Sequence, residues 1–149
     1  AQLAYLEKQV ADAKAKGAKL LLGGQRMKRP GFYFEPTVLT EVNHSMELMK
    51  EESFGPVIGI QKVKEDLDAI ALMNDTEYGL TAAVYCSEEE RARRILAHID
   101  SGSAYWNCCD RVSPHLPWCG RKHSGMGCTL SLDGIRTFVQ PKAWHLLCP

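Results

Sequence analysis

The sequence lacks an excess of charge of either sign, because its 18 Lys and Arg residues are matched by 18 Asp and Glu residues. It also lacks the run of about eighteen apolar residues that a membrane-spanning helix needs. Its first residues show no basic segment followed by an apolar one, as an export signal would. The clustered basic footprint of a nucleic-acid binder is missing too. We therefore expect a soluble, cytoplasmic protein with reduced thiols and with no nucleic-acid or membrane partner.

The length and the start of the chain give two further expectations. A chain of 149 residues, of which 45% are hydrophobic, is long enough to bury one globular core without disulfides or metals. It begins at Ala1 without an initiating Met and enters directly on an amphipathic pattern. This start favours a fragment of a longer protein.

Hydrophobic periodicity predicts the first elements of the fold. Residues 3–18 carry apolar side chains at helical spacing, so we expect an amphipathic helix there. The apolar run 19–22, stopped by two glycines, is typical of a buried strand that ends in a turn. Residues 32–40 are rich in aromatic and β-branched side chains and predict another strand. Pro36 favours an edge or a bend, because it cannot donate a ladder hydrogen bond.

From residue 57 onward, strand and helix patterns alternate. The expected order is strand 57–60, helix 65–74, strand 80–86, a helix reaching Ile99, and strand 103–107. Ser87 is expected to cap the second of these helices. The alternation is typical of right-handed βαβ crossovers and predicts an α/β fold with a mostly parallel sheet.

The last third of the chain carries turn residues followed by an apolar end. About twenty residues after Asn107 are rich in proline and glycine, and loops of this length are usually functional or disordered. Residues 130–139 return to helical spacing. The apolar tail 141–149 is expected to add as a strand to another sheet edge. We therefore predict a domain at 1–140 and an oligomerisation strand at 141–149 that makes a homo-oligomer.

A compact acidic and aromatic motif, E-E-S-F-G-P, occupies residues 51–56. Its two carboxylates are followed by an aromatic ring and a Gly-Pro turn. A carboxylate can accept two hydrogen bonds from a vicinal diol, which is how acidic residues bind a nucleotide ribose. In isolation the motif is equally compatible with a solvated helix end followed by a tight turn.

Further motifs precede and follow residues 51–56 in a fixed order. They are found at residues 17–20, 23–24, 31–39, 74–80, 101–102, 107, 116–118 and 124–127. Together with the motif at 51–56, they make the chain resemble the C-terminal part of the NAD(P)-dependent aldehyde dehydrogenases over nearly its whole length. The resemblance implies part of an aldehyde-dehydrogenase-like catalytic domain that ends in the family's oligomerisation strand.

The resemblance also implies what this chain does not contain. In that family a cysteine thiolate attacks the aldehyde, the adduct transfers hydride to the nicotinamide, and water activated by a glutamate hydrolyses the thioester. The nucleophile lies in a Gly-Gln-x-Cys motif upstream of the matched motifs, as do the oxyanion asparagine, the general base and the dinucleotide-binding domain. Residues 24–27 have Met27 in place of the thiol, so their similarity to that motif is coincidental. We therefore expect no catalytic residue in this chain and no activity of the chain alone.

Two cofactor-binding residues follow from the resemblance. Glu52 would bind the nicotinamide-ribose hydroxyls, and Phe54 would pack beside the nicotinamide of NAD or NADP. Binding by this chain alone is expected to be weak or absent, because the domain that presents the dinucleotide is missing.

Three residues, Asp110, Val112 and Trp118, fall where the family lines its channel for the aldehyde substrate. The aromatic side chain of Trp118 suggests an apolar or aryl aldehyde. Arg111 and His115 could supply the opposite preference, for an anionic one.

The cysteine and histidine residues of the last third allow another interpretation. A tetrahedral zinc site could take four ligands from Cys108, Cys109, His115, Cys119, His123 and Cys128. No C-x-x-C pair is present, so small apolar packing of the thiols is favoured and no metal is expected. The remaining alternative to an enzyme part is a non-catalytic assembly module that oligomerises through residues 141–149.

Overall fold

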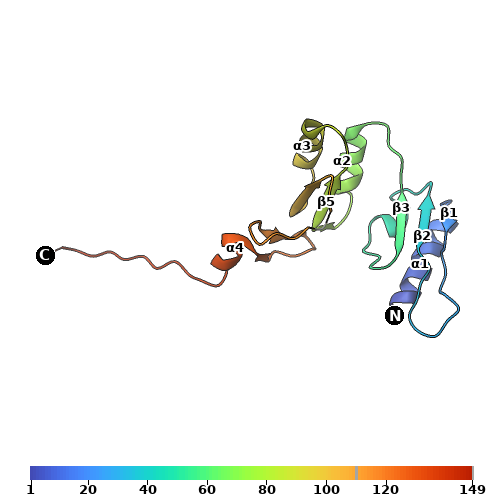
Figure 1. Cartoon of the computed structure of the whole chain (residues 1–149), viewed down its shortest axis with the longest axis horizontal. Coiled ribbons are helices and arrows are strands. Elements are labelled where there is room, and N and C mark those ends of the chain that lie inside the picture. Colours follow the sequence, from blue (N-terminus) through green and yellow to red (C-terminus); the bar gives the residue numbers. More distant parts are fainter. Residues whose placement is uncertain (110, 149) are drawn as a thin grey trace. The chain divides into compact units, whose positions relative to one another are not determined.

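The computed structural model describes residues 1–109 and 111–148 and shows helices and strands in two compact units (Figure 1). Unit 1 covers residues 1–77 and unit 2 covers residues 78–149. Asp110, expected to line the substrate channel, lies outside the described residues. In the described part of the chain, no helix is long and apolar enough to cross a bilayer. The α/β class expected from the sequence is confirmed.

Unit 1 is built on a three-stranded sheet in the order β1-β2-β3. β1 (Lys19–Leu22) pairs antiparallel with β2 (Thr37–Thr40), and β2 pairs parallel with β3 (Val57–Ile60). The predicted strand 32–40 is therefore confined to its last 4 residues. β2 is the central strand rather than an edge, because it starts after Pro36, whose missing donor then interrupts no ladder.

Helix α1 (Gln2–Ala15) supplies one side of the core of unit 1, as its periodicity predicts. Leu6 and Ala13 on this helix are 2% and 0% exposed. They belong to one hydrophobic cluster with Leu39 of β2 and with Met46. Burial of these side chains is the main favourable contribution that holds the helix against the sheet.

The connection from β2 to β3 carries the motif at residues 51–56. It contains the short helix η1 (Glu47–Met49). Because this connection returns the chain to the end of the sheet where β2 begins, β3 runs parallel to β2. Helix α2 (Asp66–Asn74) follows β3 and confirms the helix predicted at residues 65–74.

Unit 2 contains a βαβ unit, as the alternation of patterns predicts. β5 (Thr81–Val84) and β6 (Ser103–Trp106) pair in parallel, and α3 (Glu89–Ala97) connects them. The prediction that Ser87 caps α3 was wrong. The helix starts later than expected, Glu88 takes the N-cap position with an extended backbone, and no side chain caps the helix.

The strands of the described residues form four small sheets, so the expected single, mostly parallel sheet is not confirmed. The pairs β2–β3 and β5–β6 are parallel, and the other pairs are antiparallel. β3 belongs to unit 1 and β5 belongs to unit 2. Hydrophobic periodicity identifies a strand but carries no information on which neighbour the strand joins.

The described residues of the predicted loop after Asn107 include the three short strands β7, β8 and β9. β7 (Trp118–Cys119) pairs antiparallel with β9 (Cys128–Thr129). β8 (Arg121–Lys122) pairs antiparallel with β4 (Tyr78–Gly79). Part of the predicted loop is therefore held by backbone hydrogen bonds within unit 2.

Unit 2 ends in α4 (Ser131–Arg136), which is shorter than the predicted helix 130–139, and then in a tail. Figure 1 shows the tail as an extended segment after α4. Residues 140–148 form no strand, and Trp144 and Leu147 are 71% and 88% exposed. The pairing of this tail with another chain and the predicted domain boundary stay predictions.

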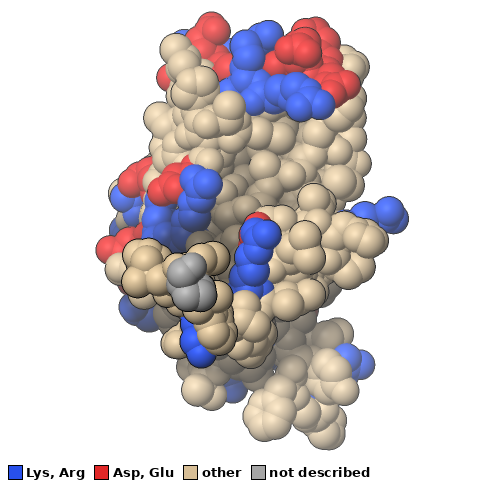
Figure 2. Space-filling view, turned by 90° about the vertical axis from the view of Figure 1, so that its left-hand side faces the viewer, with Lys and Arg blue, Asp and Glu red and all other residues tan. Residues whose placement is uncertain are grey.

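Charges of both signs are mixed on the surface. Figure 2 shows basic and acidic side chains close together on one face of the molecule, without a large area of a single sign. Ion pairs within single helices contribute to this mixing, such as Arg93 with Glu89 on α3. The face drawn there carries no basic stripe of the kind that binds a phosphate backbone.

Candidate functional site

The motif at residues 51–56 follows η1 and places both predicted cofactor residues at the surface. Glu52 is exposed and forms no hydrogen bond or ion pair with another described residue. Phe54 is 81% exposed and has a φ of 46°. A left-handed backbone is uncommon outside glycine, and here it turns the chain just before Gly55 and Pro56. One short loop therefore presents an unpaired carboxylate and an uncovered aromatic ring.

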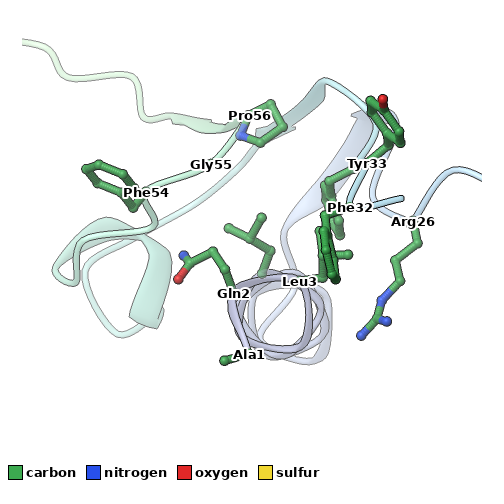
Figure 3. A pocket seen from close by; sticks show the side chains of 11 residues that line it. Ala1, Gln2, Leu3, Arg26, Phe32, Tyr33, Phe54, Gly55 and Pro56 are labelled. Carbon is green, nitrogen blue, oxygen red and sulfur yellow. The ribbon is translucent and has the colours of Figure 1, made fainter. Parts of the chain in front are cut away.

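Helix α1 holds this loop at two points. The side-chain amide of Gln2 donates a hydrogen bond to the carbonyl oxygen of Ser53, and Figure 3 shows Gln2 directed toward the loop. Farther along the helix, Lys8 forms an ion pair with Glu47 at 2.9 Å. The backbone N–H of Glu47 donates to Asp12 Oδ2, also at 2.9 Å. The side chains of Glu52 and Phe54 are thus free, whereas the backbone that carries them is attached.

Two carboxylates near the loop are held in their charged form. The pKa of Asp12 is lowered, because Lys16 forms a hydrogen bond to it at 2.7 Å and because it accepts a backbone N–H. The pKa of Asp75 is lowered as well, first by Lys50 at 3.0 Å and then by His44 at 2.9 Å. Lys50 directly precedes the motif, and its ion pair with Asp75 connects the motif to the C-terminal end of α2.

A hollow of about 530 Å³ adjoins the loop and the N-terminal end of α1. Apolar and aromatic side chains form much of its lining, among them Leu3, Phe32 and Phe54 (Figure 3). Arg26 also lines it and forms an ion pair with Glu7 at 2.8 Å. All 6 cysteines of the chain lie outside unit 1. The hollow is suited to an apolar or aromatic group, and it offers no thiol nucleophile.

The predicted substrate residues belong to unit 2, whereas the predicted cofactor residues belong to unit 1. Val112 is exposed in a segment without regular structure, and Trp118 is half-buried in β7, opposite Thr129 of β9. The hydroxyl of Tyr105 donates to the carbonyl oxygen of Arg111 at 3.3 Å, which fastens the segment before Val112 to β6. This hydrogen bond was not predicted from the sequence, because a contact between a side chain and the carbonyl of another residue produces no recognisable sequence pattern.

The cysteine and histidine residues considered for a zinc site do not form a cluster that could bind a metal ion. Among the described residues, no three His, Cys, Asp or Glu side chains lie close enough together to bind one metal ion. Cys119 and Cys128 are in contact, with their sulfur atoms 3.5 Å apart. The zinc interpretation therefore has no geometric support. Two cysteines flanking a glycine-rich turn were the signal that could have indicated their contact.

Comparisons with known proteins give matches that cover most of this chain. The model of the Aldehyde dehydrogenase family matches residues 1–144. The chloroplastic betaine aldehyde dehydrogenase of Atriplex hortensis is 41% identical over 135 residues, which make up 89% of this chain and 27% of that protein. The NADP(+) succinate-semialdehyde dehydrogenase of Deinococcus radiodurans is 41% identical over 137 residues, or 92% of this chain and 29% of that protein.

Solved structures give the same result. The crystal structure of betaine aldehyde dehydrogenase from Staphylococcus aureus in complex with NAD+ matches with a TM-score of 0.86 and 34% identity. The match covers 92% of this chain and 28% of that one. The chain thus spans less than a third of the length of these relatives.

Proposed function

Because the chain belongs to the aldehyde dehydrogenase family, we propose that it is the C-terminal part of an NAD(P)-dependent enzyme that oxidises an aldehyde to a carboxylic acid. Glu52 binds the nicotinamide-ribose hydroxyls, and Phe54 packs beside the nicotinamide. The segment with Asp110, Val112 and Trp118 lines the aldehyde channel. The bound dinucleotide supplies the hydride acceptor, and the nucleophile comes from a part of the enzyme outside these residues.

The exposure of Glu52 and Phe54 on an attached loop is the observation that carries this proposal. A carboxylate without a protein partner can accept hydrogen bonds from two neighbouring hydroxyls. Covering a fully exposed Phe side chain contributes about 1.5 to 3 kcal/mol. A ligand with a vicinal diol next to a flat ring satisfies both groups, and nicotinamide riboside has this chemistry. Attachment of the loop to α1 reduces the entropy lost on binding.

The first test uses the chain alone. We expect no reduction of NAD+ or NADP+ above the buffer rate when the chain is mixed with betaine aldehyde or benzaldehyde, because these residues contain no Gly-Gln-x-Cys nucleophile motif. The measurement is the absorbance of the reduced nicotinamide. Reduction at an enzyme-like rate would show that the chain contains its own nucleophile and would overturn this part of the proposal.

The role of Glu52 is tested in a chimera, in which this chain replaces the matching part of the Atriplex hortensis enzyme. Glu52→Gln should raise the KM for NAD+ about tenfold or more, because a charge-assisted hydrogen bond contributes about 1.5 to 3 kcal/mol. Glu51→Gln is the matched control, since Glu51 is the neighbouring exposed carboxylate. Equal effects of the two substitutions would contradict the assignment. So would a folded, unsubstituted chimera without activity.

We also propose that residues 141–149 make the chain a homo-oligomer by adding a strand to a second copy. The apolar side chains of Trp144 and Leu147 are largely exposed, and the described backbone from residue 140 to 148 forms no ladder. An extended segment with unpaired N–H and C=O groups is a template for strand addition. Light scattering should give a mass that falls to the monomer when residues 141–149 are deleted. An unchanged mass would contradict the proposal.

A further inference from the structure

We propose that Cys119 and Cys128 form a reversible disulfide within the chain, and that this pair is its preferred site of thiol oxidation. The two residues lie directly opposite each other in the β7–β9 pair. The thiol of Cys119 donates to the sulfur of Cys128 at 3.5 Å. Both thiols are free and half-buried in the structure.

The backbone of the β7–β9 pair suits such a bond. Directly opposed residues of antiparallel strands have Cα atoms about 4.5 or 5.5 Å apart. Disulfides join Cα atoms about 4.4 to 6.8 Å apart, so both spacings fall within the required range. The sulfur atoms must approach from 3.5 Å to a bond length of about 2.05 Å. Rotation of the two side chains can supply most of this approach, because neither strand has to change its register.

Close backbone packing holds both strands in place. A Cβ atom on Gly102 would overlap the carbonyl oxygen of Cys119, so the backbone before β6 lies directly against β7. A Cβ atom on Gly134 of α4 would overlap the backbone of Thr129, so α4 lies directly against β9. Because β7 packs against the backbone at Gly102 and β9 packs against α4, the two strands keep the sulfur atoms of Cys119 and Cys128 close together. Their effective concentration is therefore high relative to other thiols of the chain.

The other four cysteines lack a comparable partner. Cys86 is half-buried, and its thiol donates to the carbonyl oxygen of Glu88 at 3.2 Å. Cys108 is half-buried, and Cys109 and Cys148 are exposed. No second contact between thiols is present in the described part of the chain. At these four cysteines no thiol is already in contact with another one, so a disulfide there needs a larger rearrangement than at Cys119 and Cys128.

The oxidation is a two-electron step with a peroxide as oxidant. A cysteine thiolate attacks the O–O bond of hydrogen peroxide, which gives a sulfenic acid and, after protonation, one water. The second sulfur displaces the sulfenic oxygen, the S–S bond forms, and a second water leaves. Two thiols and one peroxide thus give one disulfide and two waters.

Either cysteine can be the first to attack the peroxide as its thiolate, because the two sulfur atoms face each other. The other cysteine then supplies the second sulfur, which closes the disulfide. The pKa of Cys128 is raised, first by its hydrogen bond with Cys119 and then by burial.

Peptide mapping tests the proposal directly. Trypsin separates the two cysteines by cutting after Arg111, Arg121, Lys122 and Arg136. Peptide 112–121 then contains Cys119 alone, and peptide 123–136 contains Cys128 alone. The reduced chain is treated with one equivalent of hydrogen peroxide, alkylated, digested and analysed by mass spectrometry without reductant. We expect the two peptides to appear as one linked species, which dithiothreitol separates, while the number of free thiols falls from 6 by two.

Three controls distinguish this pair from unspecific oxidation. Cys119→Ser should abolish the linked species, whereas Cys86→Ser should leave its yield unchanged, with circular dichroism showing that both variants fold. The same oxidation in concentrated urea should lower the linked yield severalfold, because the strands no longer oppose the sulfur atoms. The proposal is overturned if urea leaves the yield unchanged. It is also overturned if Cys119 and Cys128 stay reduced while other thiols oxidise, or if chains are mainly joined to each other.

Discussion

The free energy of unfolding should fall by about 3 to 5 kcal/mol when Leu39 is replaced by alanine. Leu39 is 0% exposed at the centre of the sheet and shares a cluster with Leu6 and Val10 of α1. The substitution loses the transfer free energy of the side chain and leaves a cavity. β2 cannot move to fill the cavity, because it is hydrogen-bonded to β1 on one side and to β3 on the other. Such a loss is a large fraction of the roughly 5 to 15 kcal/mol that stabilises a typical domain.

Leu21→Ala is the matched control for this prediction. Leu21 belongs to the neighbouring strand β1 and is 55% exposed, so the same substitution should cost only about 0.5 kcal/mol. Urea unfolding followed by circular dichroism measures both variants against the unsubstituted chain. If both midpoints shift equally, Leu39 is not a core residue of unit 1 and the packing of α1 on this sheet is wrong.

Gly102→Ala should destabilise unit 2 by about 3 kcal/mol, at the upper end of what overpacking costs. The new methyl group would overlap the carbonyl oxygen of Cys119. A flexible side chain could rotate away from such a contact, but a backbone carbonyl cannot, so β7 would have to move. The movement would also separate Cys119 from Cys128 and lower the yield of their disulfide.

Gly127→Ala separates this steric effect from the general effect of replacing a glycine. Nothing lies within 4 Å of a Cβ atom at Gly127, and neither this residue nor Gly102 has a positive φ. Alanine at an unstrained position should be neutral or stabilise the chain by about 0.4 to 1 kcal/mol. Thermal unfolding of the two variants measures the difference. Similar losses for both would show that the contact between Gly102 and Cys119 is not tight.

Local patterns predicted the elements well and their pairing poorly. The spacing of apolar residues in α1 and α2 shows a helix without knowledge of the partner, because each turn repeats the same geometry. The same logic identified β6. It failed for the cap of α3 and for the extent of α4, because helix ends depend on the backbone of a few residues rather than on a repeat.

In the candidate site too, local features could be predicted from the sequence and contacts between distant segments could not. The motif at residues 51–56 was visible in the sequence because its residues are neighbours. The hydrogen bonds that attach its loop were not visible, since Gln2 lies 51 positions from Ser53 and Asp12 lies 35 positions from Glu47. No pattern within either segment indicates that the two meet.

By itself, the sequence determined the α/β class, most helices and strands, and the similarity to the aldehyde dehydrogenase family, because each of these depends on residues that are close together in the chain. Only the tertiary structure decided how the described strands pair, with β2 between β1 and β3 and with β5 beside β6. It also decided that α1 holds the loop of Glu52, and that Cys119 faces Cys128 across two strands. These features arise from contacts between distant segments, whose free energy depends on how the whole unit packs.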